Sequence, residues 1–325
     1  MQKAESRGQL VLAVDLGGTK IIAALISSKG EMVDRDYSLT LANEGPEPVI
    51  GRIFSAVDRL CSRSKISPFQ LSAVSIAAAG VIDMKKGIIT KSPNLPGWID
   101  IPLRERVEDK YKVNTFLIND ANAAALGEHR FGAGKGTNNL VLLTLGTGIG
   151  GGIIINGDLY FGSSGGAGEV GHMTIDVNGP RCNCGNIGCL EVLASGKAVA
   201  REAIKRINRG EKSCLTEMVE GRIENITARE VSLAAQEGDS LASEVIARAA
   251  DYLGAAMVNL VNIFNPEIIV VGGGMSNMGE LLLEPVGQIV KERAFKLSAQ
   301  AVRIVPAQLG EDAGVFGAAA FAFQQ

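Results

Sequence analysis

Residues 9–27 read QLVLAVDLGGTKIIAALIS, and this stretch decides how the chain begins to fold. Two runs rich in leucine, isoleucine and alanine flank a turn from Asp15 to Lys20. Such runs predict two strands, and the Gly-Gly pair predicts a hairpin between them. Backbone amides of a glycine turn can point at phosphate, with Thr19 and Lys20 as extra donors. Most hairpins of this kind are only structural, so both interpretations remain open here.

Asp15 ends the first of these strands, which we expect to be buried. A buried carboxylate without a partner is costly, so Asp15 should meet a metal ion or a hydrogen-bond donor.

The same strand-and-glycine pattern occurs twice more. Residues 140–156 read LVLLTLGTGIGGGIIIN, and their glycines match the dinucleotide fingerprint G-x-G-x-x-G. That fingerprint requires a helix after the glycines, whereas the isoleucines at 153–155 predict a strand and therefore a second hairpin. A third apolar run, 267–271, ends in Gly272, Gly273 and Gly274. The sequence contains no P-loop motif.

The composition describes a folded protein that is long enough for two domains. The 325 residues are 46% hydrophobic and 21% charged, with a formal charge of −3. This balance argues against a nucleic-acid surface, which needs a basic face. The longest helical apolar run, 253–264, is too short for a membrane span. The first residues, MQKAESRGQ, lack the basic and apolar regions of a secretory signal, so we expect a cytoplasmic protein with reduced cysteines.

Residues 168–191, GEVGHMTIDVNGPRCNCGNIGCLE, concentrate the metal-binding chemistry of the chain. His172, Cys182, Cys184 and Cys189 supply four ligands, the number that closes a structural tetrahedral zinc site. Disulfide-bonded or simply buried cysteines are the alternatives. A metal here would order a glycine-rich loop and hold the two carboxylates at its ends, Glu169 and Glu191, around a ligand.

Apolar periodicity and turn residues predict the remaining elements. We expect strands at 31–41, 71–79, 113–118, 267–271 and 301–306. We expect helices at 46–64, 120–129, 190–209, 227–236, 240–264, 279–295 and from 312 onward. Thr227 and Glu230 form a capping box, and His129 should lie on the surface.

Two polar residues allow a structural and a functional interpretation. Asn94 lies in SPNLPGW, residues 92–98, whose prolines predict a rigid loop; its side chain could bind a polar ligand or close an Asx-turn. Asp120 lies where a helix N-cap belongs, but also at the carboxyl end of a strand, where ligands of α/β proteins gather.

The chain resembles a known family through five motifs in family order. DLGGTK, NDANAAALGE, GTGIGGG, GEVGH and CNCGNIGCLE resemble the bacterial ROK family (repressors, open reading frames, kinases), and within it the ATP-dependent glucokinases. The resemblance implies an α/β, two-domain actin-like ATPase or sugar kinase (ribonuclease H-like) fold with an interdomain cleft. We expect a small domain of residues 1–118 plus 312–325 and a large domain, 119–311, that carries the zinc loop.

The resemblance also implies roles for individual residues. Asp120 would be the catalytic base. The sugar would be bound by Gly80, Asn94, Asn119, Asp120, Glu169, His172 and Glu191. ATP and Mg²⁺ would be bound by Asp15, Gly17, Gly18, Thr19, Lys20, Gly146, Thr147, Gly148, Gly272, Gly273 and Gly274. The zinc would be structural, with His172 using one ring nitrogen for the metal and the other for a sugar hydroxyl.

The activity implied is ATP-dependent phosphorylation of a hexose, with glucose converted to glucose 6-phosphate. A kinase for N-acetylmannosamine, N-acetylglucosamine, fructose or mannose is the alternative. A sugar-responsive repressor is a remote alternative, because family repressors carry a DNA-binding segment before the DLGGTK element, which here begins at residue 15. Beyond sugar and ATP we expect no nucleic-acid or membrane partner. Relatives also imply a homo-oligomer, a dimer or a tetramer.

Overall fold

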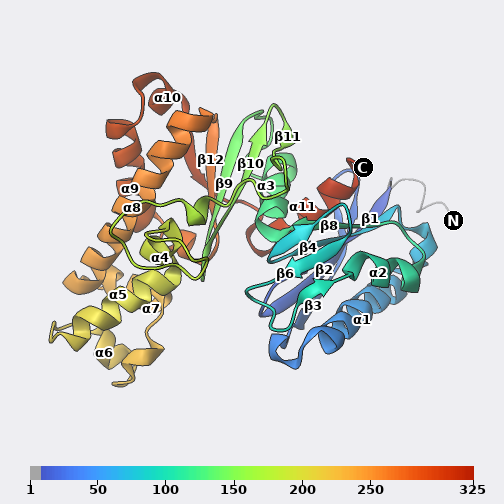
Figure 1. Ribbon diagram of the computed structural model, residues 1–325, viewed down its shortest axis with the longest axis horizontal. Coiled ribbons are helices and arrows are strands. Elements are labelled where there is room, and N and C mark those ends of the chain that lie inside the picture. Colours follow the sequence, from blue (N-terminus) through green and yellow to red (C-terminus); the bar gives the residue numbers. More distant parts are fainter. Residues whose placement is uncertain (1–8) are drawn as a thin grey trace. The chain divides into compact units, whose positions relative to one another are not determined.

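The computed structural model describes residues 9–325, which form two compact units (Figure 1). The first unit comprises the chain up to Thr137 together with Gly152–Gly168 and Ala307–Gln325. The second comprises Asn138–Gly151 and Glu169–Pro306. The expected lack of a secretory signal concerns residues 1–8 above all, and these lie outside the described part of the chain.

The compact units do not follow the expected domain boundaries at residues 118 and 312. The helix that begins at Asp120 falls in the first unit because it packs against the last helix of the chain. Gly127 shows how close this packing is, since a Cβ atom there would lie 2.9 Å from the backbone nitrogen of Gly317. A compact unit is not necessarily a domain that folds independently, so the predicted domain division stays a prediction.

The first unit is built on a five-stranded sheet with the order β3-β2-β1-β4-β8. Its strands are β1 (Leu10–Leu16), β2 (Lys20–Ser27), β3 (Met32–Leu39), β4 (Ala73–Ala78) and β8 (Thr115–Asn119). The predicted hairpin is confirmed, because β1 and β2 pair antiparallel from Leu10↔Ser27 to Leu16↔Ile21. β1, β4 and β8 run parallel, so their carboxyl ends meet at one edge of the sheet.

Helices cover both faces of this sheet, and β1, β2 and β4 are accordingly buried at nearly every position. Leu12, Val14 and Leu16 belong to a core that also contains the apolar face of α1 (Pro46–Ser64), which lies beside β2 and β3 (Figure 1). α11 (Ala313–Ala322) packs on β1 and β4. A Cβ atom at its Gly314 would collide with the carboxylate of Asp15, so a residue without a side chain is needed there.

Smaller elements complete the first unit. The antiparallel sheet β5-β6-β7 consists of Val81–Asp83, Ile88–Lys91 and Ile99–Ile101. α2 (Leu103–Tyr111), which the sequence did not predict, packs against β8. α3 (Asp120–Phe131) follows β8 directly. The loop at 92–98 contains no helix or strand, as predicted, and buries Trp98.

The second five-stranded sheet has the order β11-β10-β9-β12-β13. Its strands are β9 (Leu140–Leu145), β10 (Ile149–Ile155), β11 (Asp158–Leu159), β12 (Ile268–Gly272) and β13 (Arg303–Pro306). β10 follows Gly148 as a strand, which confirms the second hairpin and excludes the dinucleotide fingerprint. β12 runs parallel to β9, with Gly272 opposite Thr144.

The helices of the second unit are centred on α8 (Ser240–Phe264), whose bounds match the prediction. α4, α5, α7 and α9 contact it: Leu190–Ala194, Gly196–Asn208, Ala228–Gln236 and Glu280–Arg293. Figure 1 shows α8 and α9 side by side. Two short helices, α6 (Leu215–Met218) and α10 (Lys296–Ala301), were not predicted.

Two predictions are wrong, and one of the two alternatives for Asp120, that it caps α3, is excluded. The expected helix at 190–209 is interrupted at Ser195, which ends α4 and caps α5 by accepting from the Ala198 amide. Asn119, and not Asp120, is the N-cap of α3. His129 is only 6% exposed, and its Nε2 lies 2.7 Å from the Thr137 carbonyl oxygen.

Among residues 9–325, no helix combines the length and the apolar composition that crossing a membrane would require.

Candidate active site and metal centre

The predicted residues of the first unit gather at the carboxyl edge of its parallel strands. β1 leads into the turn Gly17–Thr19, β4 leads toward Gly80, and β8 ends at Asn119. The Asn119 side chain accepts hydrogen bonds from the amides of Ala121 and Asn122 and donates to the Gly80 carbonyl oxygen at 3.2 Å. Asn119 therefore caps α3 and ties it to the end of β4.

Asn94 approaches the first glycine turn directly. A Cβ atom on Gly18 would lie 2.8 Å from the backbone oxygen and 3.0 Å from the Cβ of Asn94. Both distances are shorter than normal van der Waals contact, so only glycine fits at position 18. The turn and the loop at 92–98 are thus packed against each other.

Electrostatics link Asp15 to Asp120. Burial and the neighbouring Asp120 carboxylate raise the pKa of Asp15 to about 7, while Lys20 opposes this rise. Asp120 itself accepts from the Ala121 amide at 2.9 Å. Two carboxylates that repel each other at a strand edge suit a site in which a cation or a proton is shared.

The second glycine turn lies against Glu191. A Cβ atom on Gly148 would collide with the Glu191 carboxylate, whose Oε2 accepts the Ile149 amide at 3.0 Å. The turn itself is closed by the Gly146 amide, which donates to the Gly148 carbonyl at 2.9 Å. A carboxylate is therefore held against the turn between β9 and β10.

The third glycine run completes this region. Gly273 has a φ of 85°, and a Cβ atom there would collide with the Leu145 backbone. The glycine that follows β12 is therefore packed on the last residue of β9. A pocket of about 770 Å³ opens beside them. Its lining includes glycine-turn residues that the sequence predicted as nucleotide ligands, Gly146, Thr147 and Gly274.

Other residues that line this pocket were not predicted. They come from α5, α7 and the turn after β12, and the polar ones among them are Lys197, Thr227, Arg229, Ser232, Gln236 and Asn277. Sequence patterns explained Thr227 as half of a capping box, which is confirmed by its amide donating to Glu230 at 2.9 Å. No motif marked the rest.

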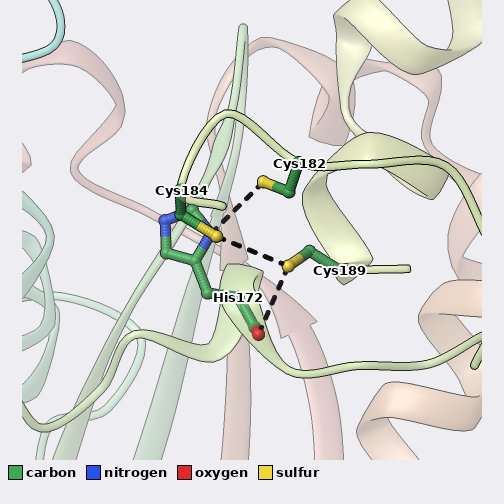
Figure 2. A group of neighbouring side chains, drawn as sticks. All are labelled: His172, Cys182, Cys184 and Cys189. Carbon is green, nitrogen blue, oxygen red and sulfur yellow. Dashed lines mark hydrogen bonds between the residues drawn. The ribbon is translucent and has the colours of Figure 1, made fainter. Parts of the chain in front are cut away.

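The four predicted metal ligands come together (Figure 2). One ligand atom each from His172, Cys182, Cys184 and Cys189 lie within 4.8 Å of one another. The Cys184 and Cys189 sulfurs are 3.7 Å apart, and the Cys182 sulfur is 3.7 Å from His172 Nδ1. A tetrahedral zinc with bonds of about 2.3 Å to sulfur and about 2.0 Å to nitrogen requires edges of about 3.5 to 3.8 Å. The cysteines are free, which excludes the disulfide alternative in this structure.

Local turns build the metal loop. Gly185 and Gly188 have φ values of 99° and 63°, which glycine adopts without strain. The Cys182 amide donates to the Asn186 carbonyl at 2.8 Å, and the Asn186 amide lowers the pKa of the Cys184 thiol. Cys182 and Cys189 are buried and Cys184 is exposed, so two of the three sulfurs are shielded from reaction with solvent species.

The metal ligands adjoin both predicted carboxylates. His172 ends the short helix η3 (Val170–His172), which Glu169 precedes as its N-cap residue. Cys189 is the N-cap residue of α4, in which Glu191 is the second residue. Gly171 packs on the Ile149 carbonyl, and Glu191 accepts the Ile149 amide. The cluster therefore ties η3 and α4 to the same backbone position.

Comparisons with known proteins agree with the motifs. The model of the ROK family matches residues 11–325. The chain belongs to the ROK family. It is 40% identical over 307 residues to a glucokinase of Halalkalibacterium halodurans, covering 94% of this chain and 92% of that protein. It is 33% identical to a xylose repressor of Caldicellulosiruptor bescii, covering 94% of this chain and 76% of the repressor.

A solved ROK structure shares the fold. The ROK family glucokinase of Streptomyces griseus, solved with glucose and AMPPNP, superposes with a TM-score of 0.83 at 36% identity. The match covers 97% of this chain and all of that one. The predicted α/β fold class, the actin-like sugar kinase fold of ROK members, is thereby confirmed.

Proposed function

We propose that this ROK protein transfers the γ-phosphoryl group of ATP to a hexose, with glucose as the preferred acceptor and glucose 6-phosphate as product. One observation supports this most strongly. In each unit, a glycine turn expected to bind phosphate is packed on a residue expected to bind sugar: Gly18 on Asn94, and Gly148 on Glu191. A kinase needs this adjacency, because donor and acceptor must react in line.

Asp120 is the residue we assign as general base. Its place at the carboxyl end of β8, beside Asn119, suits contact with a sugar hydroxyl. In a loose phosphoryl-transfer transition state the base orients the acceptor hydroxyl and takes its proton late. Burial, and after it the neighbouring Asp120 carboxylate, raise the pKa of Asp15, and a bound magnesium ion would offset both effects.

Magnesium would neutralise charge on the phosphates during transfer. Asp15 is the carboxylate of this chain that we expect near it, with the amides of the Gly17–Thr19 turn and Lys20 contacting phosphate oxygens. The pocket lined by Gly146, Thr147 and Gly274 has room for the nucleoside.

Zinc is our proposal for the cluster of His172 and the three cysteines. The spacing of the ligand atoms fits a tetrahedral site, and four protein ligands leave no open position for water. The metal would therefore be structural, fixing Glu169 and Glu191. His172 Nδ1 faces Cys182, which leaves Nε2 as the nitrogen for a sugar hydroxyl.

A sugar panel tests the activity. Purified protein with ATP and Mg²⁺ is supplied with glucose, mannose, fructose, N-acetylglucosamine or N-acetylmannosamine, and ADP release is followed. We expect the highest kcat/KM for glucose. A preference for an acetylated sugar would assign the alternative kinase. Sugar binding without ADP release for any acceptor would favour a sensor, as in the xylose repressor relatives, and would overturn the proposal.

Asp120→Asn tests the base. The variant should bind glucose while kcat falls by about 10²- to 10⁴-fold, the usual contribution of a general base. Equilibrium glucose binding provides the control that the site is intact. Retention of most of the wild-type kcat would contradict the assignment.

A further inference from the structure

Glu311 forms an ion pair with a residue that the proposed activity requires for phosphate. Lys20 Nζ lies 2.7 Å from Glu311 Oε1, and both residues belong to the first unit. Lys20 directly follows the glycine turn Gly17–Thr19 and begins β2. Glu311 lies in the short helix η6 (Gly310–Asp312) that precedes α11. The sequence did not single out Glu311.

A second cation keeps Glu311 in place. Arg35 of β3 donates from Nε to Asp312 Oδ1 at 2.7 Å, and its Nη2 is 3.9 Å from Glu311 Oε2. The hydrogen bond from Lys20 also lowers the pKa of Glu311, so the Glu311 carboxylate is charged at neutral pH. Glu311 would therefore remain beside the turn after losing contact with Lys20.

The buried anchor of this segment explains why η6 lies where it does. Glu128 of α3 is completely buried, and its Oε1 accepts the amides of Gln308 and Leu309 at 2.9 and 2.7 Å. Its Oε2 accepts the Ala133 amide at 2.8 Å. The bonds to Gln308 and Leu309 fix the chain immediately before Gly310, and so fix the position from which Glu311 reaches Lys20.

We propose that Glu311 is a resident counter-ion of Lys20 that competes with the phosphate donor and so weakens donor binding. The inference rests on the proposed role of Lys20 as a phosphate ligand. An ammonium group is a point charge that binds whichever anion is nearest. The donor must therefore displace the Glu311 carboxylate, or bind beside its negative charge. Either event weakens binding of the donor. Glu311 therefore raises the KM for ATP, and it does so without contacting the sugar.

The size of the effect follows from exposure. The side chains of Lys20 and Glu311 are 31% and 69% exposed, so water screens the pair. Exposed ion pairs contribute up to about 1 kcal/mol, which is about a fivefold change in an equilibrium constant. Glu311→Gln should therefore lower the KM for ATP about two- to fivefold and leave the KM for glucose unchanged.

Glu47→Gln is the matched control. Glu47 pairs with Arg106 in the same unit, with side chains 71% and 36% exposed, but it does not contact the glycine turn. This variant should leave both KM values at the wild-type level. A second test uses Lys20→Gln as background, in which adding Glu311→Gln should no longer change the KM for ATP.

Ionic strength provides an independent readout. The ratio of the wild-type KM for ATP to that of Glu311→Gln should approach one as salt rises from about 0.05 to about 0.5 M, because salt screens exposed charges. A higher KM for ATP in Glu311→Gln would overturn the inference, since Glu311 would then support the donor or its magnesium ion. An unchanged KM in a wild-type-like kinase would also overturn it. Failure of the wild-type protein to release ADP would instead reject the proposed function.

Discussion

The two glycine turns have the same design but differ in what packs against them. The turn at Gly17–Gly18 meets the backbone of Asn94, while the turn at Gly146–Gly148 meets the carboxylate of Glu191. Backbone cannot move away without distorting a loop, whereas a carboxylate can rotate. The first contact is therefore rigid and the second is adjustable.

Because Glu191 can rotate, a further element is needed to hold it against the second turn. Asn94 lies in a loop stiffened by two prolines and anchored by the buried Trp98. Glu191 lies at the start of a five-residue helix, which is too short to be stable alone. The metal cluster adjoins that helix through Cys189. We infer that the proposed zinc holds Glu191 against the second turn, as the proline-containing loop holds Asn94 against the first.

Of the variants considered, substitution of a metal ligand should have the largest effect on activity. It should perturb the second turn and leave the first intact. Cys184→Ser leaves three ligands, so we expect loss of zinc, a lower melting temperature and about a 100-fold lower kcat/KM for glucose. Metal content, thermal unfolding and kinetics check this. Cys214→Ser, a cysteine of the same unit outside the cluster, is the control. Full activity in a preparation without zinc would contradict the role given to the metal.

The rigid contact predicts the next largest effect. Gly18→Ala introduces a Cβ atom 2.8 Å from the Asn94 carbonyl oxygen, which must shift the loop or the turn. We expect kcat/KM to fall about tenfold or more, with the KM values for both ATP and sugar raised. Gly51→Ala in α1, where nothing lies within 4 Å, should be active. Equal activity of the two variants would show that the close approach has no functional consequence.

Asp15 predicts a smaller effect that depends on pH. Because its pKa rises from 3.8 to about 7 on folding, the folded protein holds a proton that the unfolded chain releases. The contribution of Asp15 to stability is therefore highest below about pH 4 and falls as pH rises through about 7. Asp15→Asn, which cannot ionise, should be more stable than wild type by about 1 kcal/mol at pH 8 and not at pH 4.

Denaturant unfolding without ATP or magnesium at both pH values measures this difference. The expected gain is smaller than the full pKa shift implies, because Asp15 is half-buried and the remaining water screens the ionised carboxylate. A gain that is equal at pH 4 and pH 8 would mean that ionisation of Asp15 is not its cause.

The sequence predicted the elements that are long and strongly patterned. α1 and α8 have the predicted bounds, and both hairpins follow from apolar runs around glycines. The metal ligands were also found, since their chemistry lies within one short segment. Such features can be predicted from sequence because the pattern that specifies each of them lies within one continuous stretch of the chain.

Features that depend on tertiary packing were not predicted. His129 was expected on the surface, but residues 121–129 of α3 are all buried, so this part of the helix has no exposed face that periodicity could mark. Glu311 meets Lys20 across the sheet edge, and the pocket lining joins three separate helical segments. No short stretch contains these relationships. The break at Ser195 was missed because it coincides with a long-range contact, in which the Gly196 amide donates to the Gly146 carbonyl at 2.9 Å.

The kinetics of Gly148→Ala test the central claim, that each phosphate turn is packed on a sugar-binding residue. The new Cβ atom should displace the Glu191 carboxylate, so the KM for glucose should rise about tenfold, and Glu191→Asp in the same protein should recover part of the loss. Gly287→Ala in α9, where nothing lies within 4 Å, should behave as wild type. An unchanged KM for glucose in Gly148→Ala would contradict the account.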